Sequence, residues 1–239
     1  MDERQLWEEY ARVYDRVYQE IGANRELLAQ MVSTAGITSC MSVLDLCGGT
    51  GNLLLALAEK DLRPHVSILD RSLDMLAQAE PKARRYGGLV AIRQADLDQP
   101  AETWGVDPHR QFDCIIDCNG SYTLNDPAAT LRELAKLAKP GAVLVQTVPK
   151  PGANVKAIFD SEIERRAALG KDPDAERGPL MEQLLPVIKC NEALLRLYGP
   201  RFFTPEQVES ALRTSGWDPI MITEAYCGTN SLAHAVLAA

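Results

Sequence analysis

The stretch Val-Leu-Asp-Leu-Cys-Gly-Gly-Thr-Gly-Asn-Leu-Leu occupies residues 43–54. A short apolar run ends in Asp45, a glycine-rich turn follows, and an apolar segment rich in alanine and leucine continues to about Lys60. This order predicts a strand, a tight turn and a helix. Glycine allows a sharp turn and a close ligand approach because it has no Cβ atom, and the first N–H groups of a helix attract anions. The stretch therefore predicts a site for a polar, partly anionic ligand.

Length and composition suit one globular α/β domain with an appendage. The chain has 239 residues, of which 46% are hydrophobic and 24% are charged. Its net charge of −8 argues against nucleic acid or an anionic membrane as a partner, because both require basic patches. The charged start Met1–Arg4 lacks the apolar core of a signal peptide, and no apolar run approaches membrane-spanning length. We therefore expect a cytoplasmic protein, and its oligomeric state, including a homodimer, is left open.

The cysteines predict neither a metal site nor a disulfide framework. They form no Cys-x-x-Cys pair, and several fall in predicted buried strands. The six positions are 40, 47, 114, 118, 190 and 227. We read them as reduced core residues.

Hydrophobic patterning predicts alternating strands and helices that end in an antiparallel hairpin. Beyond the first strand, the predicted strands cover residues 66–70, 89–97, 112–119, 142–148, 220–226 and 232–237. Further predicted helices cover residues 4–21, 25–34, 131–137, 155–168, 180–197 and 204–216. We expect Asn24 to be an N-cap, Pro140 and Gly141 to stop the helix before them, and residues 170–178 to form a polar loop.

The glycine turn resembles motif I of the class I S-adenosylmethionine (SAM) methyltransferases, Asp/Glu-x-Gly-x-Gly-x-Gly. Cys47 stands where the first glycine of that motif is common, which is a mild departure if Cys47 keeps a negative φ angle. The dinucleotide fingerprint fits less well, because Leu54 replaces its third glycine. The resemblance implies a Rossmann-like, seven-stranded and mostly parallel sheet with a terminal antiparallel hairpin. It also implies one methyltransferase domain over residues 1–239, with SAM as cofactor.

Candidate cofactor residues follow from this reading. Asp70 lies about 20 residues beyond the glycine turn, the offset at which an acid receives ribose hydroxyls. Other positions match the family's motifs, near the adenine, in the glycine turn or at a strand end. These are Asp45, Cys47, Gly48, Gly49, Gly51, Arg71, Met75, Asp96, Leu97 and Cys118.

Two additions to the minimal fold are expected to border the site. Tyr14-Asp15 resembles a pair in the N-terminal helix of small-molecule methyltransferases that helps close the SAM pocket, so residues 1–35 are interpreted as lid helices. Residues 150–200 are too long for a simple connection, and in this family such an insertion commonly caps the substrate. Simple packing of these helices on the domain remains the alternative for both.

The resemblance implies methyl transfer to a small-molecule acceptor, such as a biosynthetic intermediate, by in-line displacement. Histidines 65, 109 and 234 fall away from the expected pocket mouth, which leaves Asp117 and Tyr122 as candidates for a general base, with catalysis by positioning alone equally open. Residues 117–120 lack the Asp/Asn-Pro-Pro-aromatic signature of nucleic-acid amino methyltransferases. A non-catalytic SAM-binding module and a SAM-using enzyme without methyl transfer are the alternatives.

Overall fold

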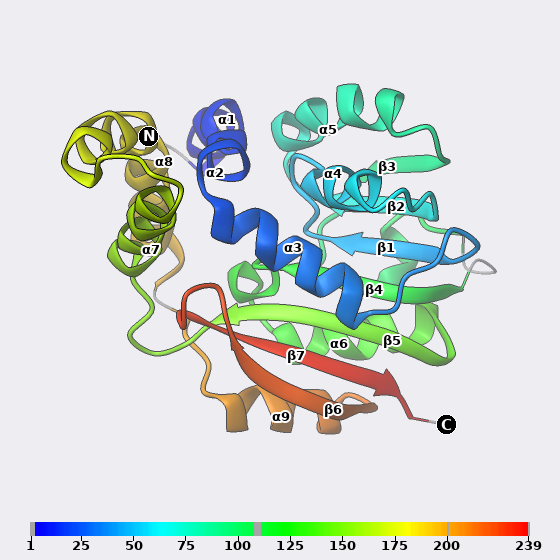
Figure 1. The fold of residues 1–239 in the computed structure, drawn as a ribbon. Helices are drawn as coiled ribbons and strands as arrows, with labels where there is room; N and C mark the ends of the chain where they lie inside the picture. The colour runs from blue at the N-terminus through cyan, green and yellow to red at the C-terminus, as the bar shows by residue number, and fades with distance from the viewer. Residues whose placement is uncertain (1–2, 108–110, 200, 239) are drawn as a thin grey trace.

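The computed structural model describes residues 3–107, 111–199 and 201–238. These residues form a seven-stranded sheet with the order β3-β2-β1-β4-β5-β7-β6 (Figure 1). The strands are β1 (Ser42–Leu46), β2 (His65–Asp70), β3 (Val90–Gln94), β4 (Phe112–Cys118), β5 (Ala138–Pro149), β6 (Trp217–Ala225) and β7 (Asn230–Leu237). Strands β1 to β5 pair in parallel, whereas β7 is antiparallel to both of its neighbours. The predicted Rossmann-like sheet with its terminal hairpin is confirmed.

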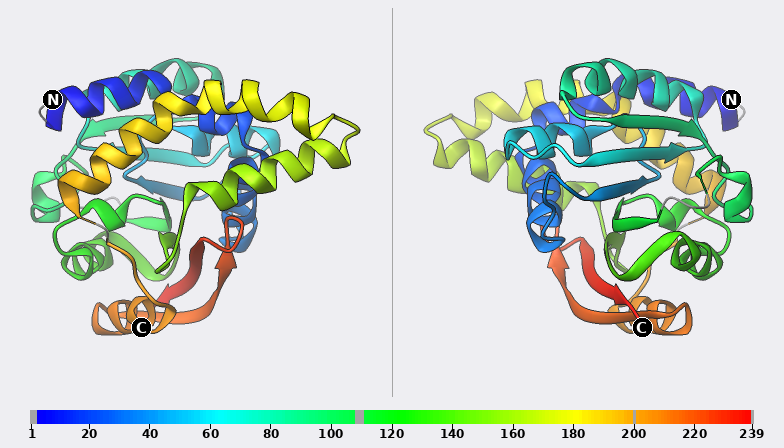
Figure 2. Two further views of the ribbon diagram at one scale, coloured as in Figure 1. Left: turned by 90° about the vertical axis from the view of Figure 1, so that its left-hand side faces the viewer. Right: turned by 90° about the vertical axis from the view of Figure 1, so that its right-hand side faces the viewer.

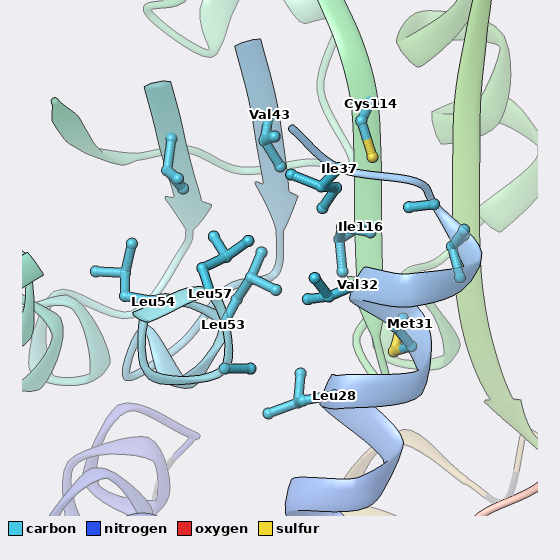
Figure 3. Close-up of a cluster of buried hydrophobic side chains, with 14 of the residues drawn as sticks. Leu28, Met31, Val32, Ile37, Val43, Leu53, Leu54, Leu57, Cys114 and Ile116 are labelled. Atoms are coloured by element: carbon cyan, nitrogen blue, oxygen red, sulfur yellow. The ribbon is translucent and has the colours of Figure 1, made fainter. Parts of the chain in front are cut away.

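Helices cover both faces of the sheet and bury its apolar side chains. On one face lie α3 (Gly22–Thr34), α4 (Asn52–Glu59) and α5 (Leu73–Tyr86); on the other lie α6 (Pro127–Leu137) and α9 (Pro205–Thr214) (Figure 1). Figure 3 shows the first face, where Met31 and Val32 of α3 and Leu57 of α4 gather over Val43 and Ile116. Central parallel strands are near-continuously apolar because both of their faces are covered in this way.

The remaining helices gather at the carboxyl edge of the parallel strands. They are α1 (Glu3–Val13), α2 (Asp15–Glu20), α7 (Val155–Ala168) and α8 (Pro173–Tyr198). The arrowheads of β1, β4 and β5 point toward them in Figure 1, and Figure 2 shows the α7–α8 hairpin reaching out past the sheet. Helix α1 packs against both α8 and α5. None of the helices in the described residues has the length and apolar character needed to cross a bilayer.

Several local predictions need correction. The helix predicted over residues 4–21 is interrupted at Tyr14. Asn24 is buried inside α3, whose N-cap is Ile21. The loop predicted over residues 170–178 is wrong, because the Asp172 side chain accepts from the Asp174 N–H and α8 begins at Pro173.

The predicted end of the helix at Leu137 is confirmed, but Pro140 and Gly141 lie within β5 and not in a turn before it. Helix α6 ends at Leu137, and Ala138 already belongs to β5, which pairs with β4 in shifted register on either side of this dipeptide. By contrast, the capping box of Thr204 and Gln207 at the start of α9 is confirmed in both of its hydrogen bonds.

Candidate active site

A cavity of about 350 Å³ opens at the carboxyl edge of the sheet, where open α/β folds bind ligands. Its first wall is formed by residues at the carboxyl ends of β1 and β2 and in the segments that follow β1, β2 and β3. These are Asp45, Cys47, Gly48, Gly49, Thr50, Asp70, Arg71, Met75, Ala95 and Leu97. Its second wall comes from α1, α2, α3, α7 and α8, the segments after β4 and β6, the end of β5 and the start of β7.

Asp70 is held in place by the glycine turn of the first wall. One carboxylate oxygen accepts the Gly49 N–H at 2.9 Å and the other accepts the Ser72 N–H at 2.8 Å. Burial raises the pKa of Asp70, and these two backbone hydrogen bonds oppose the rise. Because each carboxylate oxygen has a second lone pair, both can also accept a ligand hydroxyl.

The glycines of the turn serve different purposes. A Cβ atom on Gly48 would lie 2.6 Å from the Asp45 carboxylate, so this position has no room for a side chain. Gly51 has a φ of +74°, and a Cβ atom there would lie 3.0 Å from the Cβ of Ala79 in α5. Gly51 therefore allows α4 and α5 to pack closely, and it is not among the cavity-lining residues.

Cys47 does not keep the negative φ angle that the sequence reading required. Its φ is +50°, in the left-handed region that glycine enters most easily. Its side chain borders the cavity and faces Gly120 after β4, where an added Cβ atom would lie 2.2 Å from the Cβ of Cys47. Burial raises the pKa of the Cys47 thiol well above its usual value.

Two further carboxyl groups lie beneath this contact. Asp45 and Asp117 are both buried, and each has one oxygen with no hydrogen-bond partner in the described part of the chain. The other oxygen of Asp117 accepts the N–H groups of Gly120 at 3.0 Å and Ser121 at 3.1 Å. Burial raises the pKa of Asp117 to about 6 and that of Asp45 well above its ordinary value. Asp117 holds the turn after β4 and does not itself line the cavity.

Four side chains cluster beside the cavity: Arg71 and Trp7 border it, and Glu3 and Tyr198 pack behind them. The Arg71 guanidinium lies 5.7 Å from the Trp7 ring and 5.1 Å from the Tyr198 ring, and it forms an ion pair with Glu3. The Tyr198 hydroxyl donates to Glu3 at 2.5 Å and accepts from Trp7 Nε1 at 2.9 Å. We call these residues the Arg71 cluster; they join α1 and α8 to the first wall.

Asp15 fastens the N-terminal helices to the glycine turn. Its carboxylate accepts from the Thr50 hydroxyl at 2.6 Å and from Lys82 Nζ at 2.7 Å, while Lys82 also donates to the Thr50 carbonyl at 2.6 Å. Tyr14, the preceding residue, borders the cavity and packs edge-on against Tyr10 at 5.2 Å between ring centroids. The N-terminal helices thus lie against the cavity, and their action as a lid stays a prediction.

The second wall is mainly aromatic and aliphatic. Burial raises the pKa of Tyr122 to about 12 and also raises those of Tyr10, Tyr14 and Tyr226, so these phenols are protonated at neutral pH. The α7–α8 hairpin adds Ile158, Phe159, Leu184, Val187, Ile188 and Leu195 to this wall. The segment predicted as a cap therefore borders the cavity, and its two helices α7 and α8 also pack against each other.

A network of amide and hydroxyl groups lies where β4 and β5 end and β7 begins. Asn119, which follows β4, has a φ of +58° and borders the cavity. Its side-chain oxygen accepts from the Thr147 hydroxyl at 3.0 Å and from Asn230 Nδ2. Thr147 in turn accepts the Asn119 N–H at 3.1 Å, and Asn230 Oδ1 is bonded to Thr229 at 2.8 Å. These bonds fix the orientation of the Asn119 amide.

The structure brings together most of the residues that the sequence singled out. Those that border the cavity are Tyr14, Asp45, Cys47, Gly48, Gly49, Asp70, Arg71, Met75, Leu97, Cys118 and Tyr122. Gly51, Asp96 and Asp117 do not border it. Asp96 is exposed and caps its own turn, accepting from the Asp98 N–H at 3.2 Å and from Gln99 at 3.3 Å.

Sequence reasoning missed Tyr198, Tyr226 and Asn119 as site residues. The two tyrosines lie far along the chain from the glycine turn, and no local pattern marks them. Asn119 had a signal, because it follows a buried central strand at the ligand-binding edge of the sheet.

Histidine and metal chemistry find little support around the cavity. His65 is exposed at the start of β2, and His234 lies within β7; His109 is outside the described residues. Within the ranges that the structure describes, no group of three or more histidine, cysteine or carboxylate side chains is placed to hold a metal ion.

Residues 43–141 match the model of the methyltransferase domain family, and they include the glycine turn, Asp70 and β4. Residues 43–141 thus form a class I SAM-dependent methyltransferase domain. SAM is the methyl donor implied by this family. The matched residues include the whole first wall of the cavity. Residues after 141, including the α7–α8 hairpin, lie outside the match.

Relatives and solved structures agree with this assignment. A demethylmenaquinone methyltransferase of Lactiplantibacillus plantarum is 32% identical over 146 residues, 59% of each chain. A SAM-dependent methyltransferase from Aquifex aeolicus has the same fold, with a TM-score of 0.61 and 18% identity over 94% of this chain and 97% of that one. The [4+2]-cyclase SpnF also shares the fold, with a TM-score of 0.61 and 14% identity over 90% of this chain and 80% of its own. The first curated relatives are matched over only 51–59% of their own length.

Proposed function

We propose that this chain transfers a methyl group from SAM to a small-molecule acceptor by in-line displacement. One observation carries the proposal: the glycine turn with its oriented Asp70 carboxylate shares a cavity with a second, largely apolar wall. A transferase needs two reactants side by side, and this cavity has a surface of different chemistry for each.

The first wall fits SAM. Asp70 presents both carboxylate oxygens to the cavity side of the glycine turn, as the two ribose hydroxyls require. Met75, Ala95 and Leu97 offer apolar surface for the adenine ring. Burial raises the pKa of Asp45, and a cationic ligand beside its unpartnered oxygen would stabilise the charged form of this carboxyl group.

When bound, SAM supplies a methyl group that is already activated on a positively charged sulfur. The main tasks of the protein are then to exclude water and to align the acceptor. Alignment alone can lower the activation free energy by about 7 kcal/mol in favourable cases. The aromatic second wall serves the first task. Its tyrosine rings also attract a cation through their faces.

Positioning, rather than deprotonation, is the better account of Tyr122 and Asp117. With a pKa of about 12, Tyr122 is a phenol at neutral pH and acts as a hydrogen-bond donor that orients the acceptor. Asp117 is removed from the cavity and uses its carboxylate to hold the turn that carries Tyr122. We therefore assign orientation to Tyr122 and a supporting role to Asp117.

The identity of the acceptor belongs to this proposal as well. The relative from L. plantarum is a demethylmenaquinone methyltransferase, but the match covers only part of both chains. SpnF, a cyclase with the same fold, makes SAM use without methyl transfer the second candidate function. A non-catalytic SAM-binding module is disfavoured because the cavity has a second, largely apolar wall.

Binding calorimetry tests the cofactor assignment. We expect SAM and its product S-adenosylhomocysteine (SAH) to bind, and NAD not to bind. Asp70→Ala should weaken SAH binding by about 10- to 100-fold, since hydrogen bonds to a charged group contribute about 1.5–3 kcal/mol. Asp96→Ala is the matched control, because it removes an equally charged side chain outside the cavity. Equal losses in both variants, or NAD binding, would refute this assignment.

Mass spectrometry tests the transfer itself. Incubation with SAM that carries a deuterated methyl group should add that label to an acceptor and release SAH in equal amount. Acceptor conversion without SAM consumption would instead establish the second candidate function.

A further inference from the structure

The charges of the cavity restrict the acceptor. Among its described lining residues, Arg71 is the sole lysine, arginine or histidine, and it belongs to the first wall, where Glu3 already pairs with it. The second wall contributes only a carboxylate, the exposed Glu192. An acceptor with a buried phosphate or carboxylate would lose its hydration here and find no counter-ion, which costs several kcal/mol.

The apolar surface of the second wall favours a ring-bearing acceptor. Tyr10, Tyr122 and Tyr226 reach the cavity from three separate parts of the fold, and Phe159 and Phe202 add two more rings. Aromatic side chains pack against a flat ring with a preference of about 0.5–1.5 kcal/mol per pair beyond simple burial. A flexible polar acceptor would gain none of this.

Within this apolar wall, Asn119 offers a hydrogen-bond donor of fixed direction. Its side-chain oxygen is engaged by Thr147 and Asn230, so the amide cannot turn over without breaking both bonds. Its Nδ2 group has no partner in the described residues, and the side chain borders the cavity. Two N–H donors are thus left for a ligand oxygen.

We propose that the acceptor is an uncharged, largely apolar ring compound with a carbonyl or hydroxyl oxygen that accepts from Asn119 Nδ2. This inference rests on the proposed function, since it names the acceptor class for the same cavity. Asn119 is then a specificity-determining residue. Its N–H donors favour binding of an otherwise apolar molecule that carries an oxygen at one place. An analogue without that oxygen would leave the donors unpaired in an apolar wall and would bind much more weakly.

Three ring probes test the inference by ligand-observed NMR titration in the presence of saturating SAH. They are 4-propylphenol, 4-propylbenzoate and propylbenzene, which share a ring and a tail and differ in one group. At pH 7.5 we expect the phenol to bind about 10-fold more tightly than the charged benzoate, and several-fold more tightly than propylbenzene. Tighter binding of the benzoate, or failure of all three to bind, would overturn the proposal.

Variants at Asn119 test whether the preference for 4-propylphenol over propylbenzene comes from the Nδ2 donors. Asn119→Asp keeps the shape and removes the donors, and Asn119→Gly removes the side chain while tolerating the positive φ angle. Both should reduce the affinity for 4-propylphenol about 10-fold toward that for propylbenzene and leave SAH affinity within about twofold. Gln30→Glu, an exposed position on α3, controls for added charge. A loss of SAH binding in both Asn119 variants would make Asn119 a cofactor residue and refute the inference.

The outcome can be separated from that of the proposed function. If SAH does not bind the wild-type protein, the proposed function fails, and the same probe series on the free protein still decides the character of the second wall. If SAH binds and the probe order is wrong, the acceptor inference alone fails.

Discussion

The two walls of the cavity are assembled from very different lengths of chain. The first wall uses residues 45–97, and each of its side chains lies within a few positions of the end of β1, β2 or β3. The second wall draws on segments from Trp7 to Asn230 that meet only when the whole fold is formed. The comparison teaches that cofactor chemistry is encoded locally here, whereas the surface for the second reactant depends on long-range packing.

The largest effect is expected where the two walls touch. Gly120→Ala would bring a Cβ atom to 2.2 Å from the Cβ of Cys47. Because the backbone fixes the position of both Cβ atoms, no side-chain rotation can relieve this contact. We expect unfolding free energy to fall by about 3 kcal/mol, as for other overpacked sites, together with a loss of SAH binding. Urea denaturation and calorimetry measure the two quantities.

A second substitution makes this prediction specific. Cys47→Gly removes the opposing Cβ atom and suits the positive φ angle, so the Cys47→Gly/Gly120→Ala protein should recover most of the lost stability. Gly178→Ala, with no atom near its added Cβ, should be neutral or stabilising. If the double variant is as unstable as Gly120→Ala, the two walls are not coupled through this contact.

Asp117 gives a nearly comparable effect that depends on pH. Its pKa is raised to about 6 in the folded protein, above the ordinary value of about 4, so the folded state binds the proton more tightly. The stability that it contributes is full below about pH 4 and is lost as the pH rises through about 6, by up to about 3 kcal/mol. Asp117→Asn should remove this part of the pH dependence between pH 4 and 7.

The variant keeps an oxygen that accepts from Gly120 and Ser121, so the turn after β4 is retained. Unfolding free energies at pH 4.5 and 7 for both proteins provide the measurement. An unchanged difference between the two pH values in the variant would assign the pH dependence to another group, of which Asp45 is the first to examine.

The contrast between the walls explains how far the sequence could be interpreted. Apolar runs located the strands, and the spacing from the glycine turn to Asp70 located an acid that the structure holds with two backbone N–H groups. The same motif reading assigned Gly51 to the cofactor, but its role is packing against Ala79, because a glycine required by a helix contact looks the same in sequence as one required by a ligand.

Other features could not be derived from local patterns. Cys47 has a left-handed backbone and lies against Gly120, which is more than 70 positions further along the chain. Tyr198 reaches Arg71 only because α8 folds back over α1. The start of α8 was a different kind of miss: Asp172-Pro173 is a proper N-cap and N1 pair, and the polar residues after it concealed the signal.

A smaller loss of stability is expected from a change at Glu162, where α2, α3, α7 and α8 meet. This change should affect the second wall and not the first. Glu162 is buried, and its carboxylate accepts from the Gly22 N–H at 2.7 Å and from Arg165 and Arg166 at 2.6–2.9 Å. Glu162→Gln keeps the volume but loses the charge, and should lower unfolding free energy by about 2 kcal/mol. It should also speed proteolysis within α7 and α8.

The two walls should respond differently to this change. SAH affinity should stay within about twofold, because Glu162 lies outside the first wall. Glu164→Gln, an exposed glutamate two residues further along α7, is the matched control and should alter none of these quantities. A Glu162→Gln protein that loses SAH binding while remaining folded would show that the first wall also depends on the hairpin.

The smallest expected effect concerns the Arg71 cluster, the place where α1 and α8 reach the first wall. Tyr198→Phe keeps the ring over Arg71 and removes the hydroxyl that accepts from Trp7 and donates to Glu3. Loss of these partly exposed hydrogen bonds should cost about 1 kcal/mol, or about fivefold in SAH affinity. The loss should appear mainly as faster dissociation, because the cluster joins α1 and α8 to Arg71 of the first wall. Tyr86→Phe is the control, since Tyr86 also carries a stacked arginine, Arg63 at 5.6 Å, but lies away from the cavity. If SAH dissociates at the same rate from Tyr198→Phe and Tyr86→Phe, the cluster fastens helices without retaining the cofactor, and the first wall holds SAH by its local residues alone.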